Sequence, residues 1–145
     1  MARTSFGVPR RTAAGTDYNR VNLLLAVLEK RCGLDMSSCD AYINIAGGIR
    51  LNEPALDLGI VLAAASSLRD TEVPESVCVF GEVGLSGEVR AVGQAENRVR
   101  EAKRLGFKRV IIPKANMGSC RKIPDIEIVP VGTAREAISA AEKKF

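Results

Sequence analysis

Apolar residues recur at helical spacing in four stretches of the chain, each bounded by residues that begin or end helices. Thr16 or Asp17 caps the first stretch and Thr133 caps the last, while Gly33 and Gly106 follow two of the helix ends. The pattern therefore predicts helices over residues 17–31, 56–68, 94–105 and 134–143.

Shorter apolar or alternating runs lie outside these helices and predict strands over residues 4–12, 40–46, 77–80, 109–112 and 127–131. Residues 84–92 supply a turn and another strand. The order of these helices and strands along the chain includes both hairpin connections and helical crossovers between strands. The expected fold is therefore α+β, a mixed α/β sandwich formed by one domain that spans residues 1–145. In the helix over 94–105, the spacing places Ala95, Val99, Ala102 and Leu105 in the core.

The composition agrees with a globular domain, because 46% of the 145 residues are hydrophobic and 26% are charged. The absence of tryptophan argues against recognition of single strands by base stacking. The middle third of the chain is acidic and both flanks are basic. Such polarity suits a nucleic-acid surface or head-to-tail assembly of identical subunits, although a basic flank is often only a solvated face.

The four cysteines form no C-x-x-C pair, and the chain has no histidine, so we expect no metal site. Reduced thiols of a cytosolic protein explain them better. The N-terminus has no apolar signal region, and no apolar run reaches the roughly 18 residues of a membrane span, so we expect neither secretion nor membrane contact.

Glycines occur at every third position from Gly81 through Gly84 to Gly87. This spacing predicts a tight strand–turn–strand segment, which we call the glycine corner. The segment lacks the spacing and the Gly-Lys-Ser/Thr ending of a phosphate-binding loop. We therefore expect no ATP binding by this chain itself.

Without histidine, a Ser-His-Asp triad is excluded, but serine–lysine chemistry is not. Ser119 and Lys122 match a bare S-x-x-K pattern, which requires the serine at the buried start of a helix. Gly118, Pro113 and Pro124 surround the pattern and predict an exposed loop instead, so we expect no catalytic role here.

Three blocks of the chain resemble the C-terminal, Lon-protease-like domain of the bacterial RadA (Sms) DNA-repair family. Shared motifs, in order, are P-R-R, D-x-N-R, G-G-I-R and G-E-V-G-L-S-G-E-V-R, within blocks at residues 6–33, 40–70 and 79–116. The resemblance implies a Lon proteolytic-domain-like fold, related to domain 2 of ribosomal protein S5.

The resemblance also locates the two catalytic positions of true Lon proteases. The nucleophilic serine falls on Asp57, within NEPALDLG, and the catalytic lysine falls on Glu96, within VGQAEN. Because an aspartate and a glutamate cannot replace a serine and a neutral lysine, the resemblance implies a domain without peptidase activity. Paired carboxylates also serve glycosidases, but a structural or interface role explains this pair better.

The family resemblance implies a longer protein with a zinc finger and a RecA-type ATPase before this domain. ATP, Mg and Zn are expected in those domains, and no cofactor is expected here. The implied context is a hexameric ring that drives branch migration on DNA in homologous recombination, in the bacterial cytoplasm at the nucleoid.

Sequence-independent contact with single- or double-stranded DNA is the expected role of the basic residues. Arg50 follows two glycines at a strand end, and Arg90 lies at the end of the glycine corner, so these two are the first candidates for phosphate contact. Weaker candidates are Arg10, Arg11, Arg98, Arg100, Lys103 and Arg104.

Two rival functions stay open at this point. An active Lon-like serine peptidase would need another serine near a base. A binding module for another recombination protein would need an apolar surface that the sequence does not locate.

Overall fold

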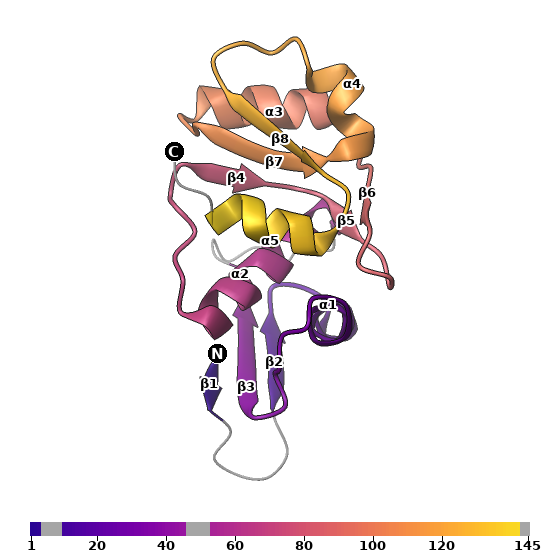
Figure 1. Ribbon diagram of the computed structural model, residues 1–145, viewed down its shortest axis with the longest axis vertical. Helices are drawn as coiled ribbons and strands as arrows, with labels where there is room; N and C mark the ends of the chain where they lie inside the picture. Colours follow the sequence, from indigo (N-terminus) through magenta and orange to yellow (C-terminus); the bar gives the residue numbers. More distant parts are fainter. Residues whose placement is uncertain (4–9, 46–52, 143–145) are drawn as a thin grey trace.

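The computed structural model describes residues 1–3, 10–45 and 53–142, and it arranges them as helices layered against three small sheets (Figure 1). The helices are α1 (Tyr18–Arg31), α2 (Asp57–Arg69), α3 (Ala95–Arg104), α4 (Met117–Cys120) and α5 (Ala134–Glu142). Two short 3-10 helices precede α2 and α4, namely η1 (Pro54–Leu56) and η2 (Lys114–Asn116).

The strands form two sheets of three strands and one hairpin. In the first sheet, β3 (Cys39–Asn44) lies between antiparallel β1 (Ala2–Arg3) and parallel β2 (Arg11–Ala14). In the second, β7 (Arg109–Pro113) lies between β4 (Val77–Val79) and β8 (Glu127–Val131), all parallel. The hairpin pairs β5 (Glu82–Val83) with β6 (Val89–Arg90).

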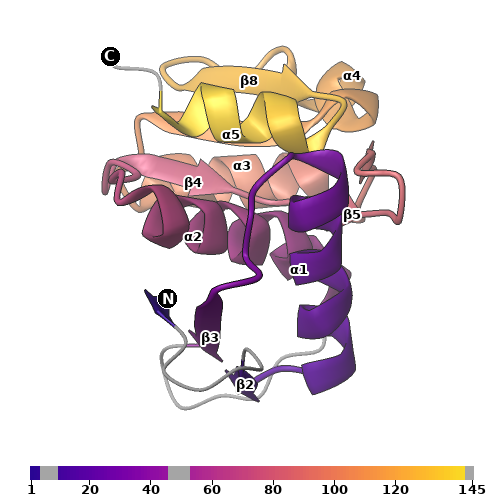
Figure 2. The same cartoon turned by 60° about the horizontal axis from the view of Figure 1, so that its bottom comes forward.

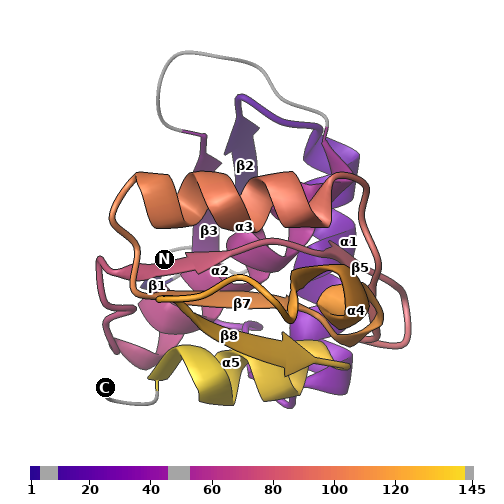
Figure 3. The same cartoon turned by 90° about the horizontal axis from the view of Figure 1, so that it is seen from above.

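The central strand β7 explains the layering, because all five of its residues are buried and they face two cores alternately. Val110 and Ile112 pack with Val99 of α3 on one face. Ile111 packs on the other face with residues of α2 and α5. The views from the side and from above agree that α3 covers one face of this sheet and α5 the other (Figures 1 and 3).

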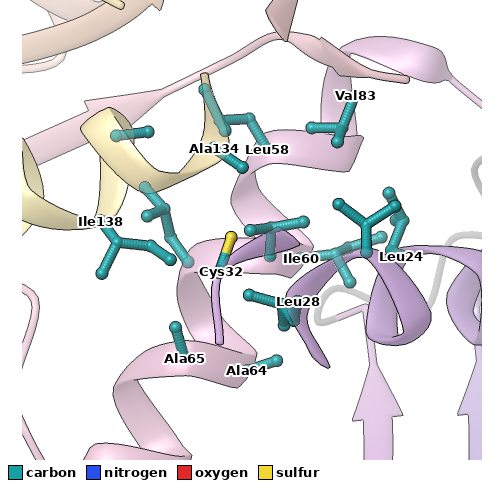
Figure 4. Packing of buried hydrophobic residues seen from close by; sticks show 14 of the residues in the cluster. Leu24, Leu28, Cys32, Leu58, Ile60, Ala64, Ala65, Val83, Ala134 and Ile138 are labelled. Carbon is teal, nitrogen blue, oxygen red and sulfur yellow. The ribbon is translucent and has the colours of Figure 1, made fainter. Parts of the chain in front are cut away.

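The larger core gathers side chains from three helices that are distant in the sequence (Figure 4). Leu24 and Leu28 of α1 meet Leu58 of α2 and Ile138 of α5 there, all nearly inaccessible to solvent. Helix α1 also packs beside the first sheet (Figure 2), so α1 and α2 join the two sheets into one body.

The structure confirms the mixed α/β class and the order of the predicted helices and strands. Asp17 caps α1 by accepting a hydrogen bond from the Asn19 amide, and Gly33 follows α1 with a left-handed φ of 69°. Thr133 accepts from the Glu136 amide at 3.1 Å and thereby caps α5. The part of the predicted first strand at residues 4–9 lies outside the described residues.

Two expectations about side chains and loops were wrong. Leu105 is 61% exposed, because it is the C-terminal cap of α3 and lies where the helix ends. The S-x-x-K stretch is not wholly a loop, since residues 117–120 form the single turn α4 and Cys120 is buried. Ser119 and Lys122 are nevertheless both exposed, and the Ser119 hydroxyl donates to the Asn116 carbonyl, so the pair has no buried base.

Candidate functional site

The first turn of α2 is positioned by its connections to the glycine corner. Glu53 caps η1 by accepting from the Ala55 amide, and Pro54 stands at the first turn, where no amide hydrogen is needed. The Leu58 amide then donates to the Gly81 carbonyl at 3.0 Å, and the Gly81 amide donates to the Ala55 carbonyl at 3.0 Å. These bonds place Asp57, the first residue of α2, directly beside strand β5.

Asp57 is 2% exposed, and its carboxylate accepts hydrogen bonds from two directions. The Arg20 guanidinium of α1 donates through both Nε, at 3.1 Å, and Nη2. The Val83 amide donates to Oδ2 at 3.0 Å, and Arg20 Nη2 also donates to the Val83 carbonyl at 3.1 Å. Helix α1, helix α2 and strand β5 therefore meet at one partly buried charge pair.

The pKa of Arg20 is raised above its ordinary value, first because its guanidinium donates to Asp57. Partial burial opposes this effect, and the negative charges of Asp57, Glu82 and Asp17 add to it. The carboxylate at the nucleophile position accepts hydrogen bonds from Arg20 and is therefore not available for covalent chemistry.

A cavity of about 290 Å³ opens beside this pair. Its lining includes the carboxylates of Asp17, Glu53 and Glu82 around the Arg20–Asp57 pair. Arg20, the basic residue of this lining, is neutralised by Asp57, and the other charged lining residues are acidic, so the lining presents no unpaired cation to a phosphate ligand. Within the described residues, no group of three or more acidic or thiol side chains has the geometry to hold a metal ion.

Glu96, the residue at the lysine position, lies elsewhere. It is exposed on the first turn of α3, and its Oε1 accepts from Nη2 and Nε of Arg100 at 2.9 and 3.3 Å. It lines a different hollow, together with Gln94, Asn97 and Ser119. Asp57 and Glu96 thus line separate cavities, and each is engaged by its own arginine.

Arg90 ends strand β6, and its side chain is 57% exposed. Its guanidinium lies 2.9 Å from Glu88 and 3.5 Å from Glu82. The pKa of Glu88 is lowered, first by its own backbone amide and then by Arg90. Arg90 therefore faces solvent with its charge largely balanced, whereas Arg50 lies outside the described residues.

The basic residues of α3 all lie close to carboxylates. Arg100 pairs with Glu96, and Arg104 pairs with Glu101, whose pKa is lowered chiefly by that hydrogen bond. The other two pairs join α3 to other segments: Arg98 with Glu53 at 3.4 Å, and Lys103 with Asp125 at 4.0 Å. Arg98 also donates to the Gly93 carbonyl and lies 6.0 Å from the Phe80 ring centroid.

The two candidates near the N-terminus differ from one another. Arg11 is partly buried, and its guanidinium donates to the carbonyls of Cys39 and Met36, which fastens β2 to the segment before β3. Arg10 is exposed, and its backbone amide donates to Asp40 at 2.7 Å. The Arg10 side chain thus has no partner within the described ranges, whereas the Arg11 side chain connects β2 to β3 and to the residues before it.

The residue that sequence reasoning missed is Arg20. The D-x-N-R motif could have drawn attention to this residue, because Asp17 and Arg20 are its two charged residues. They lie one turn apart at the start of α1. The sequence does not show that Arg20 reaches Asp57, which is 37 residues away along the chain.

An apolar groove of about 460 Å³ lies between α3 and β4, and it shares the lining residues Glu53 and Leu56 with the cavity beside Asp57. Phe80, Phe107 and the exposed Leu105 are among its lining residues. Its volume exceeds the roughly 290 Å³ of the cavity beside Asp57, and its charged lining residues are Glu53, Arg98 and Glu101.

Comparison with known proteins gives a consistent result. Residues 31–143 match the family described as the Lon protease (S16) C-terminal proteolytic domain. The chain is 56% identical over 138 residues to DNA repair protein RadA of Bacillus subtilis, covering 95% of the chain and 30% of that protein. It is 49% identical over 141 residues to the RadA of Listeria monocytogenes, covering 97% of the chain and 31% of that protein.

The same similarity extends to a cyanobacterium. The RadA protein of Synechocystis is 45% identical over 141 residues, covering 97% of the chain and 28% of that protein. The chain therefore spans about 30% of the length of the curated relatives that it matches. Among the described helices, none is both long and apolar enough to cross a membrane.

Proposed function

Because this chain belongs to the Lon protease (S16) C-terminal proteolytic domain family, we propose that it is a Lon-like domain without peptidase activity. It serves a longer DNA-repair protein of the RadA type, as its similarity to RadA proteins suggests. In that protein it supports assembly of a ring, hexameric in our proposal, and binds DNA without sequence preference during branch migration.

The observation that carries this proposal is the ion pair between the partly buried Arg20 and the buried Asp57. A serine–lysine dyad works when a desolvated lysine accepts the serine proton. Here the nucleophile position holds a carboxylate that accepts from Arg20 and from the Val83 amide. Glu96, at the base position, lines a different hollow and pairs with Arg100. The residues at the two positions thus support a structural role.

Surface charge supports the DNA-binding part of the proposal. Exposed ion pairs such as that of Arg90 with Glu88 contribute only about 0–1 kcal/mol, so a phosphate oxygen can replace the carboxylate at little cost. Arg50 and Arg90 are the proposed primary contacts, and the exposed Arg10 and the basic residues of α3 are weaker ones.

The remaining parts of the proposal concern the longer protein. ATP, Mg and Zn bind in its other domains, and residues 1–145 form one domain that needs no cofactor. Other recombination proteins are further partners, and the place of action is the bacterial nucleoid in the cytoplasm.

A salt titration of DNA binding tests the proposal directly. Replacing Arg50 and Arg90 with alanine removes two phosphate contacts, and each contact contributes about 0.9 to the slope of log affinity against log salt on duplex DNA. We expect the double variant to bind more weakly and with a slope shallower by about 1.8 in mobility-shift assays.

The matched control replaces Arg31 and Arg135, two exposed arginines with no ion pair among the described residues. This control removes the same charge and is expected to keep the original slope. Equal affinities and slopes for the R50A/R90A variant and the unmodified chain would refute the assignment of these two contacts. Failure of the unmodified chain to bind DNA even at low salt would refute the DNA-binding role.

A further inference from the structure

The basic C-terminal third of the chain divides into paired and unpaired cations. Arg98, Arg100, Lys103, Arg104 and Arg109 all lie within ion-pair distance of carboxylates. Five other basic residues from this third form no ion pair with any residue of the described ranges: Lys108, Lys114, Arg121, Lys122 and Arg135. Three of these five belong to one short segment, residues 114–122.

Residues 114–122 are mostly helical, and the segment has one buried and one exposed side. The 3-10 helix η2 continues directly into α4, and the Arg121 amide donates to the Met117 carbonyl at 3.0 Å. Cys120 is fully buried and Ile123 is 5% exposed, so these side chains anchor the segment to the core beneath α3. Lys114, Arg121 and Lys122 are exposed, and we call them the α4 basic face.

The spacing of these residues places two of the three charges on one side of the segment. Lys114 and Arg121 are seven residues apart along a nearly continuous helical path, which places them on the same side two turns apart. The Asn116 side chain donates to the Val92 carbonyl and accepts from the Val92 amide, at 3.1 and 3.0 Å. These two bonds fix the segment beside β6, at an outer corner of the molecule (Figures 1 and 3).

The carboxylates near this face each lie within ion-pair distance of another cation. Asp125, three residues after Lys122, is 4.0 Å from Lys103. Glu82 and Glu88 are paired with Arg90 at the adjoining hairpin. Glu96, which shares a hollow with Ser119 of α4, is paired with Arg100. Among the described residues, the three cations of the α4 basic face thus form no ion pair, whereas each arginine of α3 pairs with a carboxylate.

We infer that the α4 basic face contacts the phosphate backbone of DNA, an inference that rests on the proposed DNA-repair function. Three cations on a firm surface match successive phosphates, and such contacts bind without reading the base sequence. The S-x-x-K pattern of the sequence thereby gains a role, since Arg121 and Lys122 belong to this face.

The test compares two triple variants with equal charge changes. The first replaces Lys114, Arg121 and Lys122 with alanine. The second replaces Lys30, Lys108 and Arg135, which are exposed, unpaired within the described ranges and outside residues 114–122. With a labelled duplex of mixed sequence, we expect the first variant to have a salt slope shallower by about 2.7. The second is expected to keep the slope of the unmodified chain.

A second measurement uses the unmodified chain and needs no variant to fold. Amine acetylation followed by mass spectrometry reports how far bound DNA protects each lysine. Protection of Lys114 and Lys122, with Lys30 and Lys108 unprotected, is expected.

Three outcomes have distinct meanings. If the unmodified chain fails to bind DNA, the proposed function fails and this inference fails with it. If it binds DNA but the two triple variants have equal slopes, or Lys114 and Lys122 stay unprotected, only this inference is overturned. If the first variant loses self-association while its DNA slope is unchanged, the face contacts a neighbouring copy, and the inference is again overturned.

Discussion

Asp57 is surrounded by groups that donate hydrogen bonds to its carboxylate. The Arg20 guanidinium and the Val83 amide occupy its two oxygens, and the start of a helix favours a negative charge at this position. Removing the carboxylate would leave a guanidinium and a backbone amide without their acceptor in a mostly buried place. The position that carries the nucleophile in Lon proteases therefore carries a stabilising ion pair in this chain.

We expect the double variant Asp57→Ser, Glu96→Lys to be inactive and less stable. It restores the residue types of the dyad, but the serine would lie against the Arg20 guanidinium, and the lysine would lie in another hollow. Loss of the ion pair is expected to lower the free energy of unfolding by about 2–3 kcal/mol. This loss is smaller than that expected for a fully buried ion pair, because the Arg20 side chain is 32% exposed.

Urea denaturation measures the stability, and casein digestion measures the activity. The control is Asp57→Asn, which keeps the shape of the side chain and one acceptor, and is expected to lose less stability than the double variant. Cleavage of casein by the double variant would contradict our account of this site, and cleavage by the unmodified chain would restore the peptidase alternative.

At the scale of elements, the glycine corner between β5 and β6 joins several parts of the fold. The Gly84 carbonyl accepts from the Gly87 amide at 3.0 Å and closes the turn, whose tip, Leu85, is 65% exposed. The Gly87 carbonyl accepts from the Ala134 amide at 2.8 Å, which ties the corner to the start of α5. The corner thus connects the hairpin, the buried carboxylate and the last helix.

Gly87→Ala is expected to destabilise the chain by about 1–2 kcal/mol, because Gly87 has a left-handed φ of 83°. A Cβ there would also meet the Cβ of Arg31 at 3.1 Å, a backbone-proximal atom that cannot move away freely. Thermal unfolding measures the loss. Gly93→Ala is the matched control, since a Cβ there meets nothing within 4 Å. Equal melting temperatures for the two variants would contradict the role of the turn.

At the scale of the whole molecule, charges separate along the parallel β4–β7–β8 sheet. Exposed Asp70, Glu72 and Glu75 precede β4 and form no ion pair within the described ranges. The α4 basic face follows the end of β7. Because β4 and β7 are parallel, these acidic and basic segments lie at opposite ends of the sheet. Such polarity favours head-to-tail contacts between copies.

Self-association is therefore expected to depend on charge and on salt. Replacing Asp70 with Asn and Glu72 and Glu75 with Gln should shift light-scattering masses toward the monomer, and added salt should do the same to the unmodified chain. An unmodified chain that stays monomeric at high concentration would restrict the ring-forming role to the longer protein. Masses that do not change in the variant would place the interface elsewhere.

Local patterns in the sequence predicted the longer helices and most of the strands. The sequence also showed which residues, Asp57 and Glu96, stand at the two dyad positions. Caps such as Asp17 and Thr133, terminating glycines and apolar periodicity act within one or two turns, so they can be read without the fold. The one-turn helix α4 and the exposure of Leu105 could not be read this way. A single turn is too short to show a helical repeat of apolar residues. The exposure of a side chain at a helix end depends on which other elements pack against it, and the sequence does not show that packing.

Only the tertiary structure decided what the charged residues do. The sequence shows that Asp57 and Glu96 cannot form a serine–lysine dyad, but the packing of α1 against α2 pairs Asp57 with Arg20. In the same way, composition shows a basic C-terminal third, whereas the fold shows which cations are balanced and which are free. Ion pairs depend on distances between atoms that are remote in the sequence, and those distances are set by the packing of the cores.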